Sequence, residues 1–174
     1  MLMAEPLTAA AFKPYGEVLA APPQGGRAYF DGGLENARGQ ARASLSMIRL
    51  APLEGLSMQA RVLERHAYSS QSFVPLSVSR WLVIVAPPAA AGGPDARRAQ
   101  AFVAGPGQAI TLLAGTWHHG LTVLDREAQF SIFMWRDGSP GDEELVTLDQ
   151  PFGIAVPPDT TATQAPTHSQ GGYT

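Results

Sequence analysis

Short apolar or alternating runs recur along this sequence between Gly and Pro residues, and no long stretch repeats its apolar positions with helical spacing. Such a pattern is typical of an antiparallel β-sandwich or barrel. We therefore predict a mostly β fold. Its expected strands cover residues 17–20, 42–50, 58–66, 72–76, 80–86, 99–105, 110–115, 116–124 and 128–136.

Helical structure is expected only near the N-terminus, in the stretch LTAAAFKPYG. The Thr8 side chain can cap a short helix there, and Pro14 and Gly16 would stop it. Farther along, the segment PPAAAGGPDAR at 87–97 predicts a loop between two strands, because Gly and Pro interrupt regular structure.

The length of 174 residues, of which 45% are hydrophobic, allows one substantial core and is short for two ordinary domains. We expect a single domain over residues 1–152. The sequence from Pro151 onward is composed like an extended chain, so residues 153–174 are predicted to form an extended or flexible tail. His168 lies in this tail and is given no role.

Charge narrows the class of partner. The formal net charge of -3 and the sequence pI near 5.7 argue against binding to nucleic acid or to an anionic membrane surface. A small-molecule substrate is therefore expected. The sequence has neither a basic segment preceding an N-terminal apolar stretch nor a run long enough to span a bilayer, which predicts a cytoplasmic enzyme.

Two residue types are nearly or wholly missing, and this limits the chemistry. The chain has no cysteine, which excludes disulfides, thiolate nucleophiles and Cys-ligated metal sites. Any metal must then be bound by His, carboxylate or amide groups. Lys13 is the only lysine, and it lies beside Pro14 near the terminus, so a Schiff-base mechanism is not expected.

Candidate site residues come first from the segment MQARVLERH at 58–66. With a period of two, Met58, Ala60 and Val62 share one face with Glu64 and His66. An otherwise apolar face would thus end in a carboxylate and an imidazole.

The strand RASLSMIRL at 42–50 suggests a cation in a similar place. Ala43, Leu45, Met47 and Arg49 share a face in this strand. We predict that Arg49 faces the interior. The opposite face also carries Ile48 and Leu50, so the pattern alone leaves the outward orientation of Arg49 equally open.

The adjacent pair in TWHHG poses a different problem, because neighbouring residues of a strand point to opposite faces. Hydrophobicity favours the face of Trp117 and His119 as the interior. The face of His118 is flanked by small residues, which would leave room for a ligand. A bulge at a neighbouring glycine could also bring both rings to a cavity mouth.

Taken singly, each of these residues has an ordinary structural explanation. Charged residues such as Glu64 and Arg49 are most often found at a surface or rim, and a single His on a strand is usually a hydrogen-bond partner. Their joint placement changes this balance, because buried charges and imidazoles are costly to desolvate unless they pair or act.

The segments LERHAYSSQSFVPL and AGTWHHGLTVL resemble the two half-motifs of a cupin barrel. The resemblance implies a double-stranded β-helix (jelly-roll) barrel in which Glu64, His66, Gln71 and His118 occupy the metal-ligand positions. It also favours His118 over His119, since His118 follows Gly115 at the motif spacing. One carboxylate, two imidazoles and a neutral amide could hold a divalent metal such as Ni, Mn or Zn, though less tightly than three histidines and a carboxylate. No organic cofactor is expected.

More specifically, LERH, QSFVPL, RWLVIVA and GTWHHGL resemble the ureidoglycolate lyase family, and the segments PLTAAAFKPYGEVL and DGSPGDEEL also fit. The resemblance covers most of residues 6–150. It implies a homodimer that cleaves (S)-ureidoglycolate to glyoxylate and urea in allantoin and purine degradation.

From pattern and motif position together, we assign His66 and His118 as acid and base catalysts, with Glu64 orienting an imidazole or binding metal. Arg49 is expected to hold the substrate carboxylate, and Gln71 is expected to hydrogen-bond the ureido group. His119 is a secondary candidate for substrate binding.

Two alternatives from other classes remain at this point. One is a non-catalytic cupin module that binds a small acid or a metal, and the absence of a helix-turn-helix segment weighs against its being a one-chain regulator. The other is a different cupin enzyme that acts on a small hydroxy or keto acid. The incomplete histidine set makes iron dioxygenase chemistry a poorer fit.

Overall fold

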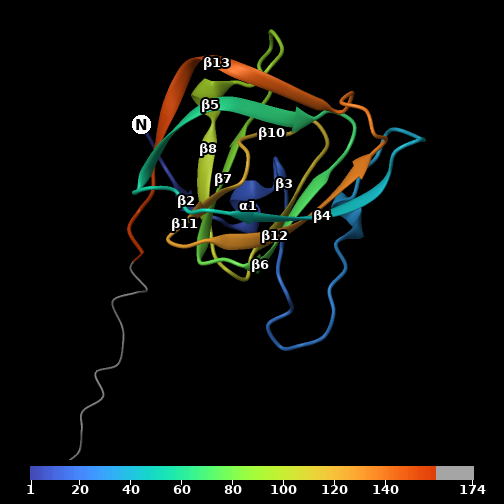
Figure 1. The fold of residues 1–174 in the computed structure, drawn as a ribbon, viewed down its shortest axis with the longest axis horizontal. Helices are drawn as coiled ribbons and strands as arrows, with labels where there is room; N and C mark the ends of the chain where they lie inside the picture. The colour runs from blue at the N-terminus through green and yellow to red at the C-terminus, as the bar shows by residue number, and fades with distance from the viewer. Residues whose placement is uncertain (160–174) are drawn as a thin grey trace, which may run out of the picture.

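A computed structural model describes residues 1–159 and shows a mostly β barrel with one short α-helix (Figure 1). The elements in chain order are β1 (Leu2–Met3), β2 (Glu5–Pro6), α1 (Ala9–Phe12), β3 (Gly16–Leu19), η1 (Asp31–Gly33), β4 (Arg42–Leu50), β5 (Ser57–His66), β6 (Gln71–Ser77), β7 (Arg80–Ala86), η2 (Ala96–Arg98), β8 (Gln100–Ala104), β9 (Ala109–Leu112), β10 (Trp117–His118), β11 (Thr122–Leu124), β12 (Ala128–Arg136) and β13 (Glu143–Ala155). The predicted mostly β, cupin-like fold with a short N-terminal helix is confirmed.

The barrel is built from two sheets that face each other. The larger sheet has the strand order β1-β13-β5-β10-β7-β8-β2, with β11 also paired to β7, and the smaller has the order β3-β9-β6-β12-β4. In the view of Figure 1, β5 and β13 lie above β4 and β12. Strands distant in sequence are therefore neighbours, and β5, β6, β10 and β12 together surround one end of the interior.

Aromatic and branched side chains fill the interior between the sheets. Trp81 and Phe130, from opposite sheets, meet edge to face with ring centroids 5.1 Å apart. Strand β7 reads RWLVIVA because it is buried on both faces: its odd-numbered residues Trp81, Val83 and Val85 join this inner core, and its even-numbered residues join apolar clusters on the other side. A strand covered on both sides needs no alternation of polar residues.

The short helix α1 forms as predicted. The Thr8 side chain accepts a hydrogen bond from the Ala11 amide at 3.2 Å, which satisfies one of the free N–H groups of the first turn. Phe12 at the end of the helix is fully buried and packs edge to face against Phe102. The helix thus packs against the inner core.

The predicted tail starts at residue 153, but residues 153–155 belong to a strand. Strand β13 continues to Ala155, and it pairs with β5 and, in parallel, with β1. Ile154 and Val156 are buried, because they cover the apolar cluster that contains Leu82 and Ile84. The Pro and Gly residues of this region predicted an irregular segment, although its apolar residues form part of a strand. The rest of the predicted tail, from residue 160 and including His168, lies outside the described residues.

Strand β5 does not keep one face throughout, contrary to the period-two prediction. Ala60 is buried and so is Leu63, three residues later, whereas Val62 is exposed. The ladder between β5 and β13 has a register shift between Thr147 and Phe152, opposite this point. An irregularity of this kind moves the inward side by one residue. Beyond it, the strand presents a new set of side chains to the interior.

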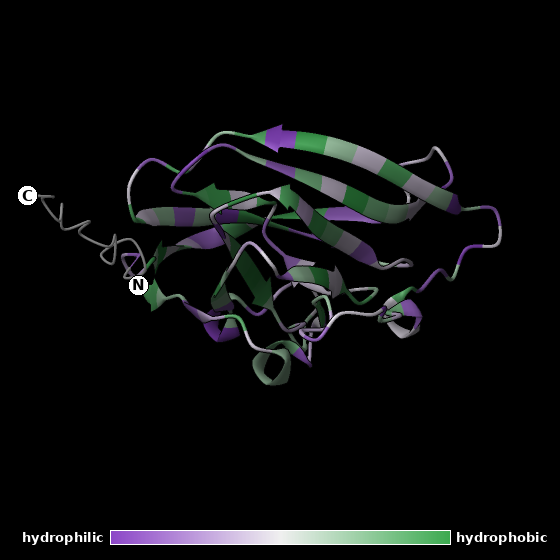
Figure 2. Cartoon of the chain, turned by 90° about the horizontal axis from the view of Figure 1, so that it is seen from below, coloured by the Kyte–Doolittle hydropathy of each residue, from purple (hydrophilic) through white to green (hydrophobic). Residues whose placement is uncertain are grey.

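The long strands alternate between apolar and polar residues, as the changing colours along them show (Figure 2). On β4, however, the apolar row points outward: Leu45 and Met47 are 70% and 67% exposed. Ile48 and Leu50 on the other face pack against the inner core. None of the helices among residues 1–159 is long and apolar enough to cross a membrane.

Candidate active site

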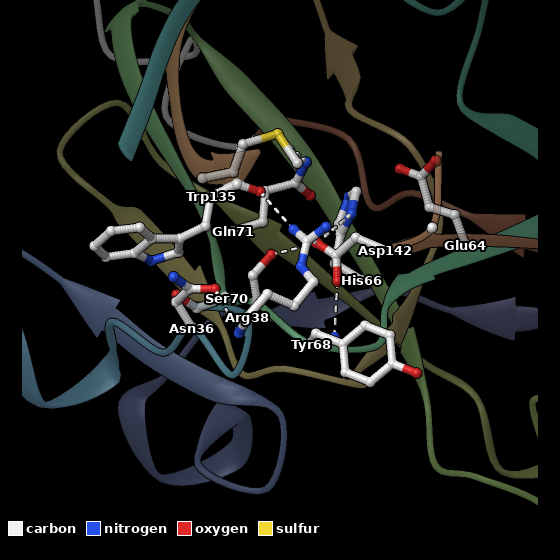
Figure 3. Close-up of polar contacts among 12 residues, drawn as sticks. Asn36, Arg38, Glu64, His66, Tyr68, Ser70, Gln71, Trp135 and Asp142 are labelled. Carbon is white, nitrogen blue, oxygen red and sulfur yellow. Dashed lines mark hydrogen bonds and ion pairs between the residues drawn. The ribbon is translucent and has the colours of Figure 1, made fainter. Parts of the chain in front are cut away.

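A cavity of about 470 Å³ opens at the end of the barrel where strands β5 and β12 end. Its wall is part polar and part apolar, and it comes from several elements: the end of β5, the start of β6, the end of β12 and the loop that follows it. Residues of the wall include Arg38, Glu64, His66, Gln71, Arg136 and Asp142. Figure 3 shows most of this group, with Arg38, His66, Gln71 and Asp142 close together and Glu64 to one side. Three of the predicted site residues, Glu64, His66 and Gln71, therefore meet here.

His118 lies directly behind this wall. It is 2% exposed and sits opposite Glu64 in the pairing of β10 with β5. Its Nε2 atom lies 3.1 Å from Gln71 Oε1 and 3.3 Å from Glu64 Oε1. The expectation that His118 faces the interior is confirmed. It reaches the cavity through Glu64 and Gln71.

The hydrogen bonds of His118 define where its protons lie. Its Nδ1 is 2.9 Å from the Thr116 carbonyl oxygen, which can only accept, so Nδ1 carries a proton. Its Nε2 faces the Gln71 oxygen and the Glu64 carboxylate, which are both acceptors. When Nε2 carries a proton, it can donate to either of these acceptors.

The turn before β10 places His66 next to His118. The Gly115 amide donates to the His66 carbonyl at 2.7 Å, and Gly115 has a φ of 79°, which favours glycine. The rings of His66 and His118 lie 6.0 Å apart between centroids. His66 Nδ1 is buried without a hydrogen-bond partner and lies 3.7 Å from Asp142 Oδ2.

Asp142 is a buried carboxylate with a full set of donors. Its Oδ1 accepts from the Tyr68 amide at 2.8 Å, and its Oδ2 accepts from the Ser69 hydroxyl. Arg38 Nη2 lies 3.1 Å from the same Oδ2. These three contacts fix the carboxylate at the side of His66, where its negative charge faces the ring.

Arg38 is a mostly buried cation with several partners of its own. Its Nη2 donates to the Trp135 carbonyl oxygen at 3.1 Å, and its Nη1 lies 2.9 Å from Asp137 Oδ2, although this second contact is not aligned as a hydrogen bond. Together with Asp142, these contacts tie the loop after β12 to the loop before β4. Arg38 therefore shapes one side of the cavity.

The environment shifts the pKa values of two groups in the wall in the same direction. The hydrogen bond from His118 lowers the pKa of the Glu64 carboxyl, against the opposing effect of burial. Burial lowers the pKa of His66, helped by the charge on His118 and opposed by Asp142. At neutral pH the site thus combines an ionised carboxylate with a neutral imidazole.

Arg49 is not part of this site, and the prediction that it faces the interior is wrong. Its side chain is 61% exposed, and its Nη1 lies 2.5 Å from Glu127 Oε1 on the outer face of the smaller sheet. The outer row of β4 is more apolar than the inner row, which reads Arg42, Ser44 and Ser46 before Ile48. Hydrophobicity alone therefore selects the wrong face of this strand.

His119 also lies apart from the cavity. Its Nδ1 is 2.9 Å from the Gly120 carbonyl oxygen, and its amide donates to the Ile84 carbonyl at 3.0 Å. On the same side of the sheet as Leu63, Trp117 is 1% exposed and lies under the Arg65 guanidinium at 4.7 Å. The Trp117 face is thus covered by a second layer of the same chain.

The four predicted metal ligands are close together, but they do not form a metal site as they lie. Gln71 Oε1 and Glu64 Oε1 lie 3.1 and 3.3 Å from His118 Nε2, whereas His66 Nδ1 faces Asp142. Within residues 1–159, no group of three His, Asp or Glu side chains is arranged to hold a metal ion.

Sequence reasoning missed the residues that loops bring to the cavity. Arg38 and Asp142 lie in segments rich in Gly and Pro, which have no period that indicates a face. Arg136 could have been found, because it ends the row of β12 that contains Phe130, Ile132 and Met134. The prediction for Arg49 was based on a cation at the end of an apolar row. The same pattern on β12 identifies Arg136, which does lie in the cavity wall.

The sequence matches known proteins over most of its length. A model of the ureidoglycolate lyase family matches residues 1–155. A putative ureidoglycolate lyase of Agrobacterium fabrum is 32% identical over 153 residues, which cover 88% of this chain and 94% of that protein. Ureidoglycolate lyases of Chelativorans sp. and Mesorhizobium japonicum are 35% and 36% identical, cover 90% of this chain, and are themselves covered over 97% and 98% of their lengths.

Proposed function

Because the chain belongs to the ureidoglycolate lyase family, we propose that it cleaves (S)-ureidoglycolate to glyoxylate and urea, as a cytoplasmic enzyme of allantoin and purine degradation. The observation that carries the proposal is the wall of the cavity, where His66, Glu64 and Gln71 lie within reach of one small molecule. These groups supply a base, a carboxylate and an amide. The reaction requires functions of these kinds.

The reaction is an elimination at a carbon that carries both a hydroxyl and a ureido group. The hydroxyl loses its proton, and its oxygen forms the carbonyl of glyoxylate. The bond between this carbon and nitrogen breaks, and its electron pair stays on the nitrogen. That nitrogen takes up a proton and leaves as urea. One base and one proton source are therefore needed.

His66 is the base in this scheme. Burial holds its pKa below the ordinary value for histidine, so the ring is neutral at neutral pH and can accept the hydroxyl proton. Asp142 lies beside the ring at 3.7 Å and stabilises the positive charge that forms on it. The neighbouring carboxylate thus favours the product of the proton transfer.

The Glu64–His118 pair is the proton source for the leaving nitrogen. His118 shares its Nε2 proton with Glu64 and Gln71, and Glu64 stands between His118 and the cavity. His118 acts through these two residues, since it does not itself line the cavity. The Gln71 amide, fixed by His118, can hydrogen-bond the ureido group, which presents donors and an acceptor.

The direct test is to incubate the purified protein with ureidoglycolate and measure glyoxylate and urea together. Equal amounts of both products are expected. Ammonia as the primary nitrogen product would indicate hydrolysis of the ureido amide and would overturn the proposed reaction.

A divalent metal is a separate proposal, and no step above depends on it. Its ligands would be Glu64, His66, Gln71 and His118, and His66 would have to turn toward the other three. The support is that oxygen atoms of Glu64 and Gln71 both lie within 3.3 Å of His118 Nε2. Loss of activity on chelation, with recovery on adding Ni, Mn or Zn, would support it. Full activity in protein shown to be metal-free would overturn it.

For the assembly, we propose a homodimer formed through the outer face of the smaller sheet. The apolar residues that this face exposes are Leu45, Met47, Val74 and Leu76. The Arg49–Glu127 ion pair lies on the same face, so a two-fold axis could bring each charge near its opposite on the second copy. An exposed apolar patch bordered by charges is typical of a protein interface.

Light scattering after size-exclusion chromatography tests this surface. Leu45→Glu is expected to convert dimers to monomers, because it places a charge at the centre of the patch. Leu145→Glu is the matched control, since Leu145 is 62% exposed on β13, in the other sheet. A wild-type monomer, or a dimer that tolerates Leu45→Glu, would overturn this part of the proposal.

A further inference from the structure

With Arg49 on the outer face, the substrate carboxylate needs another cation, and strand β12 provides one. Arg136 is exposed and lies in the wall of the cavity that contains Glu64, His66 and Gln71. In the pairing of β12 with β6, Met134 is opposite Gln71. Because alternate residues share a face, Arg136 follows Met134 on the inner side, toward the mouth of the barrel.

A second arginine stands directly opposite the first. The register of β12 with β4 pairs Arg136 with Arg42 at the ends of both strands. Further along the same pairing, Ile48 is opposite Phe130, whose side chain is fully buried in the inner core. Arg42 and Arg136 are therefore both on the inner face, at its open end.

This pair is uncompensated, unlike the third arginine near the cavity. Arg38 is held by Asp137, Asp142 and the Trp135 carbonyl. Within residues 1–159, neither Arg42 nor Arg136 forms an ion pair. Like charges directly opposite each other destabilise a pair of antiparallel strands. An anion bound between them would remove this repulsion.

We propose that Arg136, assisted by Arg42, binds the carboxylate of the substrate, an inference that rests on the proposed lyase function. The guanidinium can donate two parallel hydrogen bonds to a carboxylate. The acidic groups of the wall, Glu64, Asp142 and Glu143, would repel the same carboxylate. The charges therefore orient the substrate, with its carboxylate toward Arg136 and its hydroxyl and ureido groups toward Glu64, His66 and Gln71.

The test compares Arg136→Ala with Arg49→Ala, which removes an exposed arginine from the outer face. Arg136→Ala should raise the KM for ureidoglycolate about tenfold to hundredfold with little change in kcat, since the carboxylate does not change in the reaction. Arg136→Lys should give a smaller rise, because lysine keeps the charge without the paired donors. Arg42→Ala should also raise KM, by less than Arg136→Ala.

A substrate without the carboxylate isolates the interaction. (Hydroxymethyl)urea would undergo the same elimination, giving formaldehyde and urea. Arg136→Ala should leave its kcat/KM unchanged while lowering that for ureidoglycolate. Inhibition by glyoxylate gives a second measure, and its inhibition constant should rise in Arg136→Ala and stay constant in Arg49→Ala. Thermal melts establish that each variant is folded.

The outcomes separate the two proposals. If the wild-type protein yields no glyoxylate and urea from ureidoglycolate, the proposed function fails. If the wild type is active and Arg136→Ala behaves like Arg49→Ala toward both ureidoglycolate and glyoxylate, the function stands and the carboxylate assignment fails. An equal loss with (hydroxymethyl)urea would also overturn the assignment, because the effect would then not depend on the carboxylate.

Discussion

The same strands build two very different ends of one barrel. At the filled end, Trp81 and Phe130 pack edge to face and are almost completely buried. At the open end, β12 carries Met134 and Arg136, and β6 begins with Gln71 in the wall of a cavity. A few residues along a strand thus separate apolar packing from polar chemistry.

The difference shows how the barrel can hold buried polar groups at one end. Uncompensated polar groups are costly to bury, and those of the open end are largely bound to one another. Asp142, Arg38 and His118 each have several partners. The filled end supplies apolar burial that offsets the remaining cost, and a rigid frame that fixes distances in the cavity. The variants below are chosen to disturb one end at a time.

The largest effect on stability is expected from removing a buried side chain at the filled end. Phe130→Ala removes a fully buried ring and leaves a cavity beside Trp81. The free energy of unfolding should fall by about 3–5 kcal/mol, as for other buried phenylalanines. Urea denaturation measures this loss. Leu145→Ala, at an exposed position of β13, is the control and should change stability little.

The contrast between the filled end and the open end would not hold if Phe130→Ala changed the catalytic activity more than the stability. At a temperature where the variant is folded, KM should stay close to the wild-type value. A large rise in KM would show that the two ends are coupled.

The next largest effect is expected at the open end. His118→Ala should lower kcat about hundredfold or more, equivalent to about 2.7 kcal/mol, because Glu64 and Gln71 lose the group that fixes them. His119→Ala is the matched control, because His119 is the next residue in the sequence and its ring is hydrogen-bonded to Gly120 outside the cavity. Its kcat should stay within a few-fold of the wild type. Steady-state kinetics with a thermal melt for each variant decides between them, and equal losses would contradict the assignment.

A smaller effect at the same end concerns the buried carboxylate. Ser69→Ala removes one donor to Asp142, which keeps Tyr68 and Arg38 as partners. The free energy of unfolding should fall by about 1–2 kcal/mol, the cost of leaving a buried acceptor partly unsatisfied. Denaturant titration measures it. No change in stability would mean that water replaces the hydroxyl.

The smallest expected effect is a pH dependence at the filled end, where Arg80 binds Asp125 through two hydrogen bonds of 2.7 and 2.9 Å. The hydrogen bonds from Arg80 lower the pKa of Asp125 below its ordinary value of 3.8. The ion pair therefore adds stability above the unfolded-state pKa, and this stability is lost as the pH falls through the lower folded-state pKa.

Asp125→Asn isolates this contribution, because asparagine tolerates the positive φ of 66° at this position. At pH 7 the free energy of unfolding of the variant should be lower than that of the wild type, by no more than about 1 kcal/mol, because the ion pair is partly exposed. The difference in free energy of unfolding between the wild type and the variant should become smaller below about pH 3. A difference that is constant across this range would exclude the ion pair as its source.

Strand positions could be predicted from the sequence where the pattern is strong. Strands β4, β7 and β12 have the predicted bounds, because each is a clear alternating or apolar run that turns or polar residues terminate. The orientation of β4 could not be predicted in the same way. Its outer row, with Leu45 and Met47, is more apolar than its inner row, and hydrophobicity does not distinguish burial in a core from exposure on a surface.

The candidate site was predictable to the extent that motifs fix it. Glu64, His66, Gln71 and His118 come from two motif segments, and they do come together. Arg38 and Asp142 depend on loops, whose paths are set by tertiary contacts such as the hydrogen bond from Ala67 to Asp142. Irregular segments have no period from which a face can be read. Their contribution to the cavity is visible only in three dimensions.

The parallel pairing of β1 with β13 has a consequence for how the chain folds during synthesis. Leu2 is opposite Ile154, so β1 must wait to form this pairing until β13 has been translated. At about 5–20 residues per second, this wait is on the order of ten to thirty seconds. Until then the apolar side chains that Ile154 covers, including Leu82 and Ile84, stay uncovered. Ribosome-bound nascent chains should therefore be bound by chaperones or cut by proteases until β13 emerges.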